Sequence, residues 1–164
     1  MKILKIVLAV LLGAFVVIQF FRPAKNISAV EQPYDITTKF TIPADVQPIL
    51  KNSCYDCHSN NTRYPWYAEV QPAGWLLDDH IRDGKRSLNF SEFTSYRLAR
   101  QYNKLEEIGD MVYDDKMPLQ SYLLLHTDAK LSREQKEKVF AWVDAARAHM
   151  EALYPPDSLT SGRR

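Results

Sequence analysis

The residues of this chain with the most distinctive chemistry lie within one short segment, Cys54-Tyr55-Asp56-Cys57-His58. The 164-residue chain has only two cysteines, and both belong to it. C-x-x-C-H is the attachment signal for c-type haem. Two thiols one helical turn apart can add to the two vinyl groups of one porphyrin, and the adjacent His58 can then bind the iron as the proximal ligand. The sequence therefore predicts one covalently attached haem, held by Cys54, Cys57 and His58.

Three other uses of this cysteine pair fit the sequence less well. A disulfide between adjacent helical turns has poor geometry and closes a very small loop. A thioredoxin-like redox pair belongs in a βαβ setting, which the sequence does not suggest. A structural zinc site needs a second pair of ligands at the usual spacing. Haem attachment remains the favoured interpretation.

The second axial ligand of the iron is a separate question. Met117 is the favoured residue because it lies in a polar loop, followed by Pro118, between two predicted helices. A Met ligand would raise the iron potential relative to a second His. His126 and His80 are the alternatives, whereas Met111 and His149 lie within helical patterns and are expected to be structural.

Two further residues shortly after the motif are candidates for binding the haem. Arg63 could pair with a propionate, and the indole N–H of Trp66 could donate to one. The alternative is a packed aromatic loop that only shields the porphyrin, since bulky rings are costly to leave in water. The sequence does not choose between these two roles.

The elements that must position these residues all show helical patterns, so the predicted fold class is all-α. Apolar residues at helical spacing favour a helix from Val46 to Cys57, with Asp45 as its cap and Pro48 in its first turn. A short helix over 75–82 is expected to end at Gly84. Asn89 and Glu92 mark another helix start, and Ser132 with Gln135 forms a capping box before the last helix. The predicted haem domain spans residues 42–156, after a linker over 23–41 and before a flexible tail over 157–164.

The first 22 residues have the composition of a signal anchor. Lys2 and Lys5 precede a run that is apolar from Ile6 to Phe21 apart from Gln19, and bulky residues stand where a signal peptidase prefers small ones. We therefore expect an uncleaved N-terminal transmembrane helix close to the lower length limit for crossing a bilayer. The net charge of +1 argues against a nucleic-acid partner.

The segment Cys54-Tyr55-Asp56-Cys57-His58-Ser59-Asn60, followed by Thr62-Arg63-Tyr64-Pro65-Trp66-Tyr67, resembles the haem-binding domain family of exported bacterial proteins, common in Bacteroidetes. The similarity extends through Asp79-His80, Gly84-Lys85-Arg86 and the Met117-Pro118 loop. It implies a cytochrome-c-like helical domain around one covalent haem c, with His58 on the iron and Met117 at the distal position. Because c-type haem is attached outside the cytoplasm, it also implies a bacterial inner-membrane protein whose haem domain faces the periplasm.

Electron transfer is the function expected from these features, with redox proteins at the membrane as partners and the N-terminal helix in the bilayer. One haem and a plausible Met ligand suffice for it, so an electron carrier is favoured over a catalyst, no residue is assigned as catalytic, and a small-molecule substrate is not expected. The alternatives are a peroxidase-like haem enzyme and a haem-based sensor or accessory subunit. A single C-x-x-C-H disfavours a self-contained two-haem peroxidase.

Overall fold

The computed structural model describes residues 1–160, and within them the chain is all-α. The described residues form eight α-helices, four short 3-10 helices and no strand. The only pairing of extended backbone among them is an isolated bridge between Ile27 and Asn61. The α-helices are α1 (Lys2–Ile18), α2 (Gln47–Ser53), α3 (Tyr55–His58), α4 (Ala73–Ser87), α5 (Leu98–Tyr113), α6 (Gln120–Leu123), α7 (Arg133–Leu153) and α8 (Pro156–Thr160). The 3-10 helices are η1 (Ile36–Thr38), η2 (Trp66–Glu69), η3 (Phe90–Ser95) and η4 (Thr127–Ala129).

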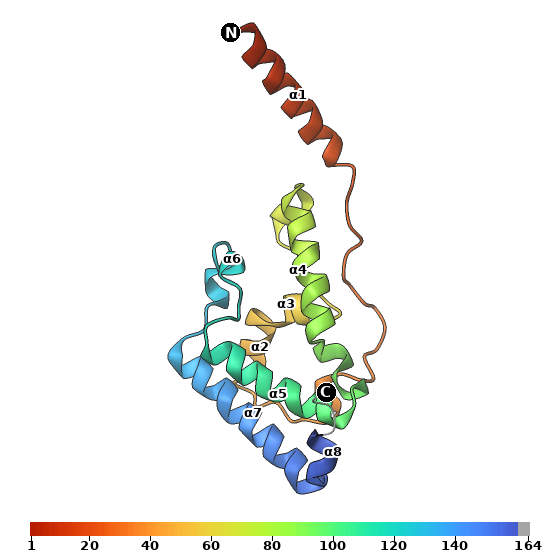
Figure 1. Ribbon diagram of the computed structural model, residues 1–164, viewed down its shortest axis with the longest axis vertical. Coiled ribbons are helices and arrows are strands. Elements are labelled where there is room, and N and C mark those ends of the chain that lie inside the picture. The colour runs from red at the N-terminus through yellow and green to blue at the C-terminus, as the bar shows by residue number, and fades with distance from the viewer. Residues whose placement is uncertain (161–164) are drawn as a thin grey trace.

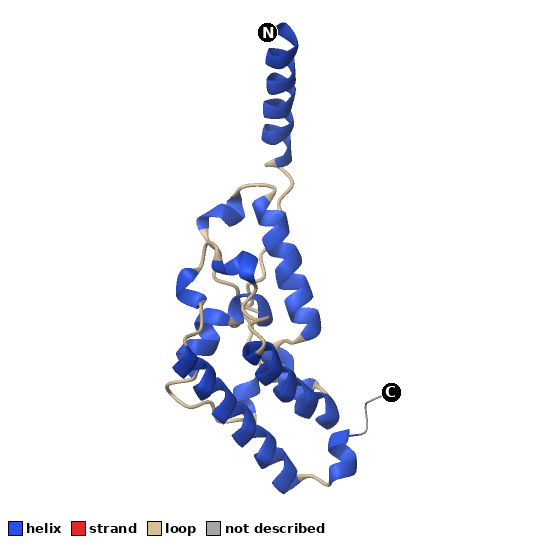
Figure 2. Cartoon of the chain, turned by 60° about the vertical axis from the view of Figure 1, so that its left-hand side comes forward, coloured by secondary structure: helices blue, strands red, loops and turns tan. Residues whose placement is uncertain are grey.

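Helices α5 and α7 run side by side (Figures 1 and 2), and buried residues from 36–50, 88–93 and α8 complete the core with them. Apolar residues at helical spacing are buried in α5 (Leu105, Ile108 and Val112) and in α7 (Val139, Val143, Ala146 and Met150), whereas Leu153 at the end of α7 is exposed. The capping box predicted at Ser132 and Gln135 is present at the start of α7. The helix start signal at Asn89 begins η3 rather than a long helix, and α5 follows it. Helices α5 and α7 are the two longest helices of the domain.

The helix predicted from Val46 to Cys57 is divided in two. α2 ends at Ser53 and α3 begins at Tyr55, because the backbone of Cys54 departs from helical geometry at φ −128°. Pro48 lies in the first turn of α2, as predicted. Asp45 does not cap that helix. Its carboxylate instead lies 3.5 Å from Nζ of Lys138 in α7.

The helix predicted over 75–82 is longer, and Gly84 lies inside it rather than at its end. A Cβ atom at Gly84 would lie 2.6 Å from the carbonyl oxygen of Cys57. Glycine is therefore needed here for close contact between α4 and α3, not for terminating the helix. This contact places α4 directly against the C-x-x-C-H segment.

The predicted linker over 23–41 is part of the folded domain. Ile36 and Phe40 are fully or almost fully buried in the core, and the side-chain amide of Asn26 donates to the carbonyl oxygen of Ser59 at 2.8 Å. The segment lacks the periodicity that identifies a helix in the sequence, which is why its packing was not predicted. The predicted tail also differs at its start, since residues 157–160 belong to α8 and Leu159 is buried. Residues 161–164 of that tail lie outside the described residues.

Helix α1 projects away from the domain, and none of its residues is buried (Figures 1 and 2). It has 17 residues, or about 25 Å at about 1.5 Å per residue, against a hydrocarbon core of about 30 Å. Within residues 1–160 no helix is both long enough and apolar enough to cross a membrane. The predicted transmembrane helix is therefore not supported, because the helix stops at Ile18 although the apolar run extends to Phe21.

Candidate functional site

The two cysteines lie where α2 passes into α3. Both are half-buried free thiols. Burial raises the pKa of Cys54 to about 12, with a contribution from Cys57, and raises the pKa of Cys57 to about 11, with a contribution from Asp56. Both cysteines line one cavity together with His58, the last residue of α3.

The ring of His58 is held by the end of α4. Its Nδ1 lies 3.0 Å from the carbonyl oxygen of Gly84 and 3.0 Å from that of Leu88. Since a carbonyl only accepts, Nδ1 carries the proton and donates, and Nε2 has the free lone pair. Fixing the tautomer through the second nitrogen is how proteins orient a metal-ligating His. Burial lowers the pKa of His58, which also favours the neutral ring.

Two adjoining cavities, of about 280 and 140 Å³, open beside this motif. Five residues line both of them: Ser53, Cys54, His58, Ser87 and Met117. Cys57, His80 and Tyr122 line the larger cavity, and Phe90, Ile108 and Met111 line the smaller one. The shared lining makes the two cavities parts of one largely apolar space.

Met117 is brought to this space by the loop after α5. Its backbone N–H donates to the carbonyl oxygen of Met111 at 3.0 Å, and a cis peptide bond joins it to Pro118. Met111, expected to be purely structural, also lines the smaller cavity. Of the two alternative ligands, His80 lines the larger cavity, whereas His126 lines neither and hydrogen-bonds with Tyr67 at 3.2 Å. The structure therefore gathers Met117 and His80, but not His126, around the motif.

Arg63 and Trp66, the two candidates for propionate binding, do not line either cavity. The guanidinium of Arg63 instead pairs with Asp56, with Nε 3.2 Å from Oδ1 and a terminal nitrogen 3.1 Å from Oδ2. The side chain of Trp66 is exposed to 80% in η2. Arg63 therefore contacts the motif through Asp56 and not through the cavities, and Trp66 lies at the protein surface.

Sequence reasoning missed Asp56, Gly84 and Tyr122. Asp56 is buried within the motif and accepts from the hydroxyl of Tyr122 at 3.0 Å. Gly84 was assigned a terminating role, and Tyr122 had no recognisable signal. Two sequence signals were available: an acidic residue between the two cysteines for Asp56, and a glycine within a helical segment for Gly84.

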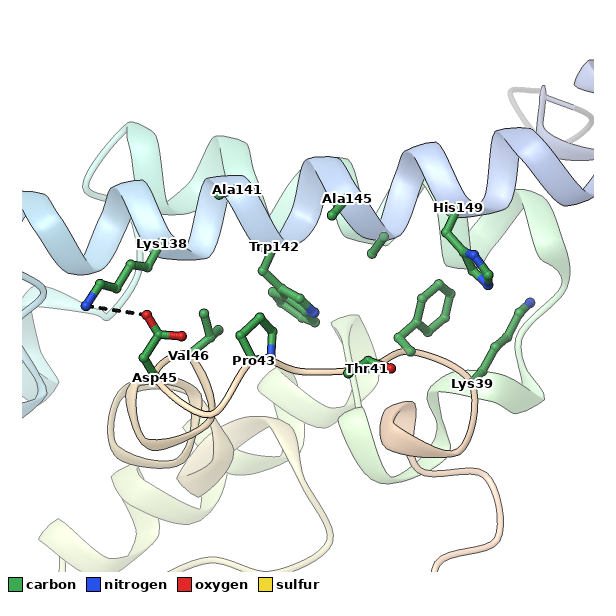
Figure 3. A pocket seen from close by; sticks show the side chains of 12 residues that line it. Lys39, Thr41, Pro43, Asp45, Val46, Lys138, Ala141, Trp142, Ala145 and His149 are labelled. Atoms are coloured by element: carbon green, nitrogen blue, oxygen red, sulfur yellow. Dashed lines mark ion pairs between the residues drawn. The ribbon is translucent and has the colours of Figure 1, made fainter.

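A further cavity, of about 520 Å³, lies away from the motif between residues 39–46 and α7 (Figure 3). Its lining includes Trp142 and His149 but neither cysteine nor His58. The chemistry needed for a cofactor is therefore concentrated at the motif and not in this larger space.

The residues around the motif fit a haem. They comprise two thiols one turn apart, an imidazole whose Nε2 is left free, a thioether and an apolar lining, which together are the groups that hold a c-type haem. These residues come from α2, α3, α4, α5 and the Met117 loop. Only the folded chain brings them together.

Comparison with known proteins gives the same cofactor. The family model described as "Haem-binding domain" matches residues 13–145. The chain is also 28% identical over 107 residues to cytochrome c peroxidase Ccp of Escherichia coli (strain K12). The aligned region covers 63% of this chain and 23% of that protein. The chain thus spans about a quarter of the length of that relative. No solved structure matches it. With the family model covering most of the chain, this protein belongs to the haem-binding domain family.

Proposed function

We propose that this chain is a monohaem c-type cytochrome, with haem bound covalently through Cys54 and Cys57 and axially by His58 and Met117. One observation carries the proposal: Cys54, His58 and Met117 line the same two adjoining cavities. The free Nε2 of His58 supports it, because its Nδ1 is already used by backbone carbonyls.

Electron transfer is the activity that this arrangement favours. Bound haem supplies one-electron chemistry. Two ligands from the protein would leave no open coordination position for a substrate, so the role of the chain is to hold both ligands in place and exclude water. The expected partners are redox proteins rather than small-molecule substrates.

We place the haem domain in the periplasm, at the outer face of the inner membrane. Covalent haem attachment outside the cytoplasm, which the resemblance to c-type cytochromes implies, supports this placement. Helix α1 supports attachment to a membrane, because its apolar side chains are unburied on every face and would be costly to leave in water. In this proposal α1 embeds in the bilayer and holds the domain at its surface.

Peroxide reduction is the second candidate, favoured by the similarity to cytochrome c peroxidase Ccp. It requires an open or displaceable sixth position with an acid–base group nearby. His80 lines the larger cavity and is the available group.

Optical spectra and a haem-stained denaturing gel test the proposal. The full chain should keep its haem after denaturation, and the ferric protein should show the weak far-red band of Met-ligated haem. Cys54→Ser with Cys57→Ser should remove the covalent haem, while the control Ser53→Ala, which changes a neighbour lining the same cavities, should retain it. Haem stain retained by the double variant would refute covalent attachment. A high-spin ferric spectrum with rapid oxidation of the reduced protein by peroxide would support the second candidate instead.

A further inference from the structure

Large apolar side chains are exposed at one end of the haem domain. Trp66 of η2 is exposed to 80%, Leu76 of α4 to 58%, and Leu124, just after α6, to 79%. Leu125 and Trp75 are exposed as well. Single exposed apolar residues are ordinary on protein surfaces, whereas a contiguous group of them marks an interaction site.

Contacts between elements place these residues at the same end of the domain. The hydroxyl of Tyr67 hydrogen-bonds with Nε2 of His126 at 3.2 Å, and the two rings lie 5.8 Å apart. This contact brings η2, with Trp66, beside the turn that carries Leu124 and Leu125. Figure 1 shows α6 at the same end of the domain as the start of α4. We call Trp66, Trp75, Leu76, Leu124 and Leu125 together the apical surface.

Helix α1 is tied to the domain at this surface. The side chain of Gln19 accepts from the backbone N–H of Gln71 at 2.8 Å and donates to the Gln71 carbonyl at 3.1 Å. The indole of Trp75 donates to the carbonyl oxygen of Phe21 at 2.6 Å. These bonds hold the end of α1 against the start of α4, so α1 projects from the apical end (Figures 1 and 2).

The charges at this junction favour an anionic neighbour. Arg22 and Lys25 both pair with Glu69, at 2.7 and 2.6 Å, so two cations share one carboxylate. The side chains of both cations remain about half exposed. Basic residues that flank an apolar helix interact favourably with anionic lipid headgroups.

We propose that the apical surface is a lipid-docking surface that rests in the headgroup region of an anionic bilayer. The inference rests on the proposed embedding of α1, because a helix tied to this end brings the same end of the domain to the bilayer. Trp side chains suit that region, with an apolar ring and one polar N–H. Burial of the apical leucines and of Trp66 then removes apolar area from water that the isolated domain leaves exposed.

Docking in this way orients the haem site as well. Tyr122, which lines the larger cavity at the motif, belongs to α6 and lies two residues before Leu124. The α6 side of the cavity would therefore face the bilayer surface, and redox partners held in or on the membrane would approach it there.

The three tryptophans of the chain provide the test, because Trp66 and Trp75 belong to the apical surface, whereas Trp142 is a buried residue of α7. The full-length haem protein is placed in nanodiscs of phosphatidylcholine and phosphatidylglycerol, with and without a lipid that carries a gadolinium chelate on its headgroup. We expect the gadolinium lipid to broaden the indole N–H signals of Trp66 and Trp75 several-fold more than that of Trp142.

A variant and its control test which residues make the contact. Leu124→Ser with Leu125→Ser should reduce the broadening at Trp66, whereas Leu153→Ser, an exposed leucine at the end of α7, should leave it unchanged. Vesicle flotation of the same protein reports on α1 separately. If the protein floats with the vesicles but the Trp66 signal is not broadened, the proposed docking surface is wrong and the membrane attachment through α1 stands. If the protein does not float, both proposals are wrong. The Trp66 signal could also stay unbroadened by the gadolinium lipid and shift with protein concentration. That result would show a contact between copies of the chain and would contradict the proposal.

Discussion

The hydroxyl of Tyr122 donates to Oδ2 of Asp56 at 3.0 Å and so joins two segments that lie 66 residues apart in the chain. Asp56 stands between the two cysteines of the motif, and Tyr122 lies in α6, shortly after Met117. Burial, followed by the neighbouring carboxylate of Asp56, raises the pKa of Tyr122, so the hydroxyl stays protonated and remains a donor. This bond ties the loop that presents Met117 to the segment that presents His58.

Replacing Tyr122 by Phe removes this bond and keeps the ring. We expect a loss of roughly 1.5–3 kcal/mol in the free energy of unfolding, the usual value for a hydrogen bond to a charged group. The far-red band of Met ligation should weaken, because the Met117 loop is no longer held to the motif. Tyr67→Phe is the matched control, since the Tyr67 hydroxyl forms its hydrogen bond with His126 rather than with Asp56. Equal effects of the two variants on the band would argue against a specific role for Tyr122.

Gly84→Ala should separate α4 from α3. The new methyl would lie 2.6 Å from the carbonyl oxygen of Cys57, so one helix must shift and the two hydrogen bonds to His58 must lengthen. We expect a destabilisation of about 1–3 kcal/mol, in the range for overpacking, and less haem per chain. In α5, Gly109→Ala meets nothing closer than 3.8 Å, so it should be neutral or stabilise by up to about 1 kcal/mol. Chemical denaturation and the haem-to-protein absorbance ratio measure both outcomes.

Met117→Ala should abolish the far-red band and lower the reduction potential. The thioether that favours ferrous iron is then lost, while Cys54, Cys57 and His58 still hold the haem. Met111→Ala is the control, because Met111 lines the smaller cavity without being the proposed ligand, and the band should survive. Should Met117→Ala leave the spectrum unchanged, His80 becomes the better assignment, as the histidine that shares the cavity.

Arg63→Gln distinguishes the observed pairing of Arg63 with Asp56 from the predicted contact with a haem propionate. Because its guanidinium pairs with Asp56, we expect a modest loss of stability and an unchanged haem spectrum. The loss should be about 1 kcal/mol or less, since the Arg63 side chain is 63% exposed and the pair is screened by solvent. A large change in reduction potential at constant stability would instead favour the propionate contact. Potentiometric titration and thermal unfolding separate the two results.

Local sequence patterns were sufficient for the fold class and for naming the candidate residues of the site. Helical spacing identified the buried faces of α5 and α7, and the capping box located the start of α7. The spacing of Cys54, Cys57 and His58 is a covalent requirement of one cofactor, so it can be read without any tertiary information. The Met117-Pro118 loop followed from the interruption of a helical pattern, which is also local.

Contacts between distant segments could not be predicted in this way. The packing of residues 23–41 on the domain, the pairing of Arg63 with Asp56 and the bond from Tyr122 depend on elements that meet only after folding. Gly84 illustrates the difference. The sequence suggests a helix end, because glycine often ends helices, whereas the structure uses the missing side chain for a close approach to Cys57. The sequence by itself therefore determined the all-α fold class and the candidate haem-binding residues, through motif spacing and helical period. Only the tertiary structure decided what orients them, because hydrogen bonds and close contacts across long chain separations leave no periodic signal.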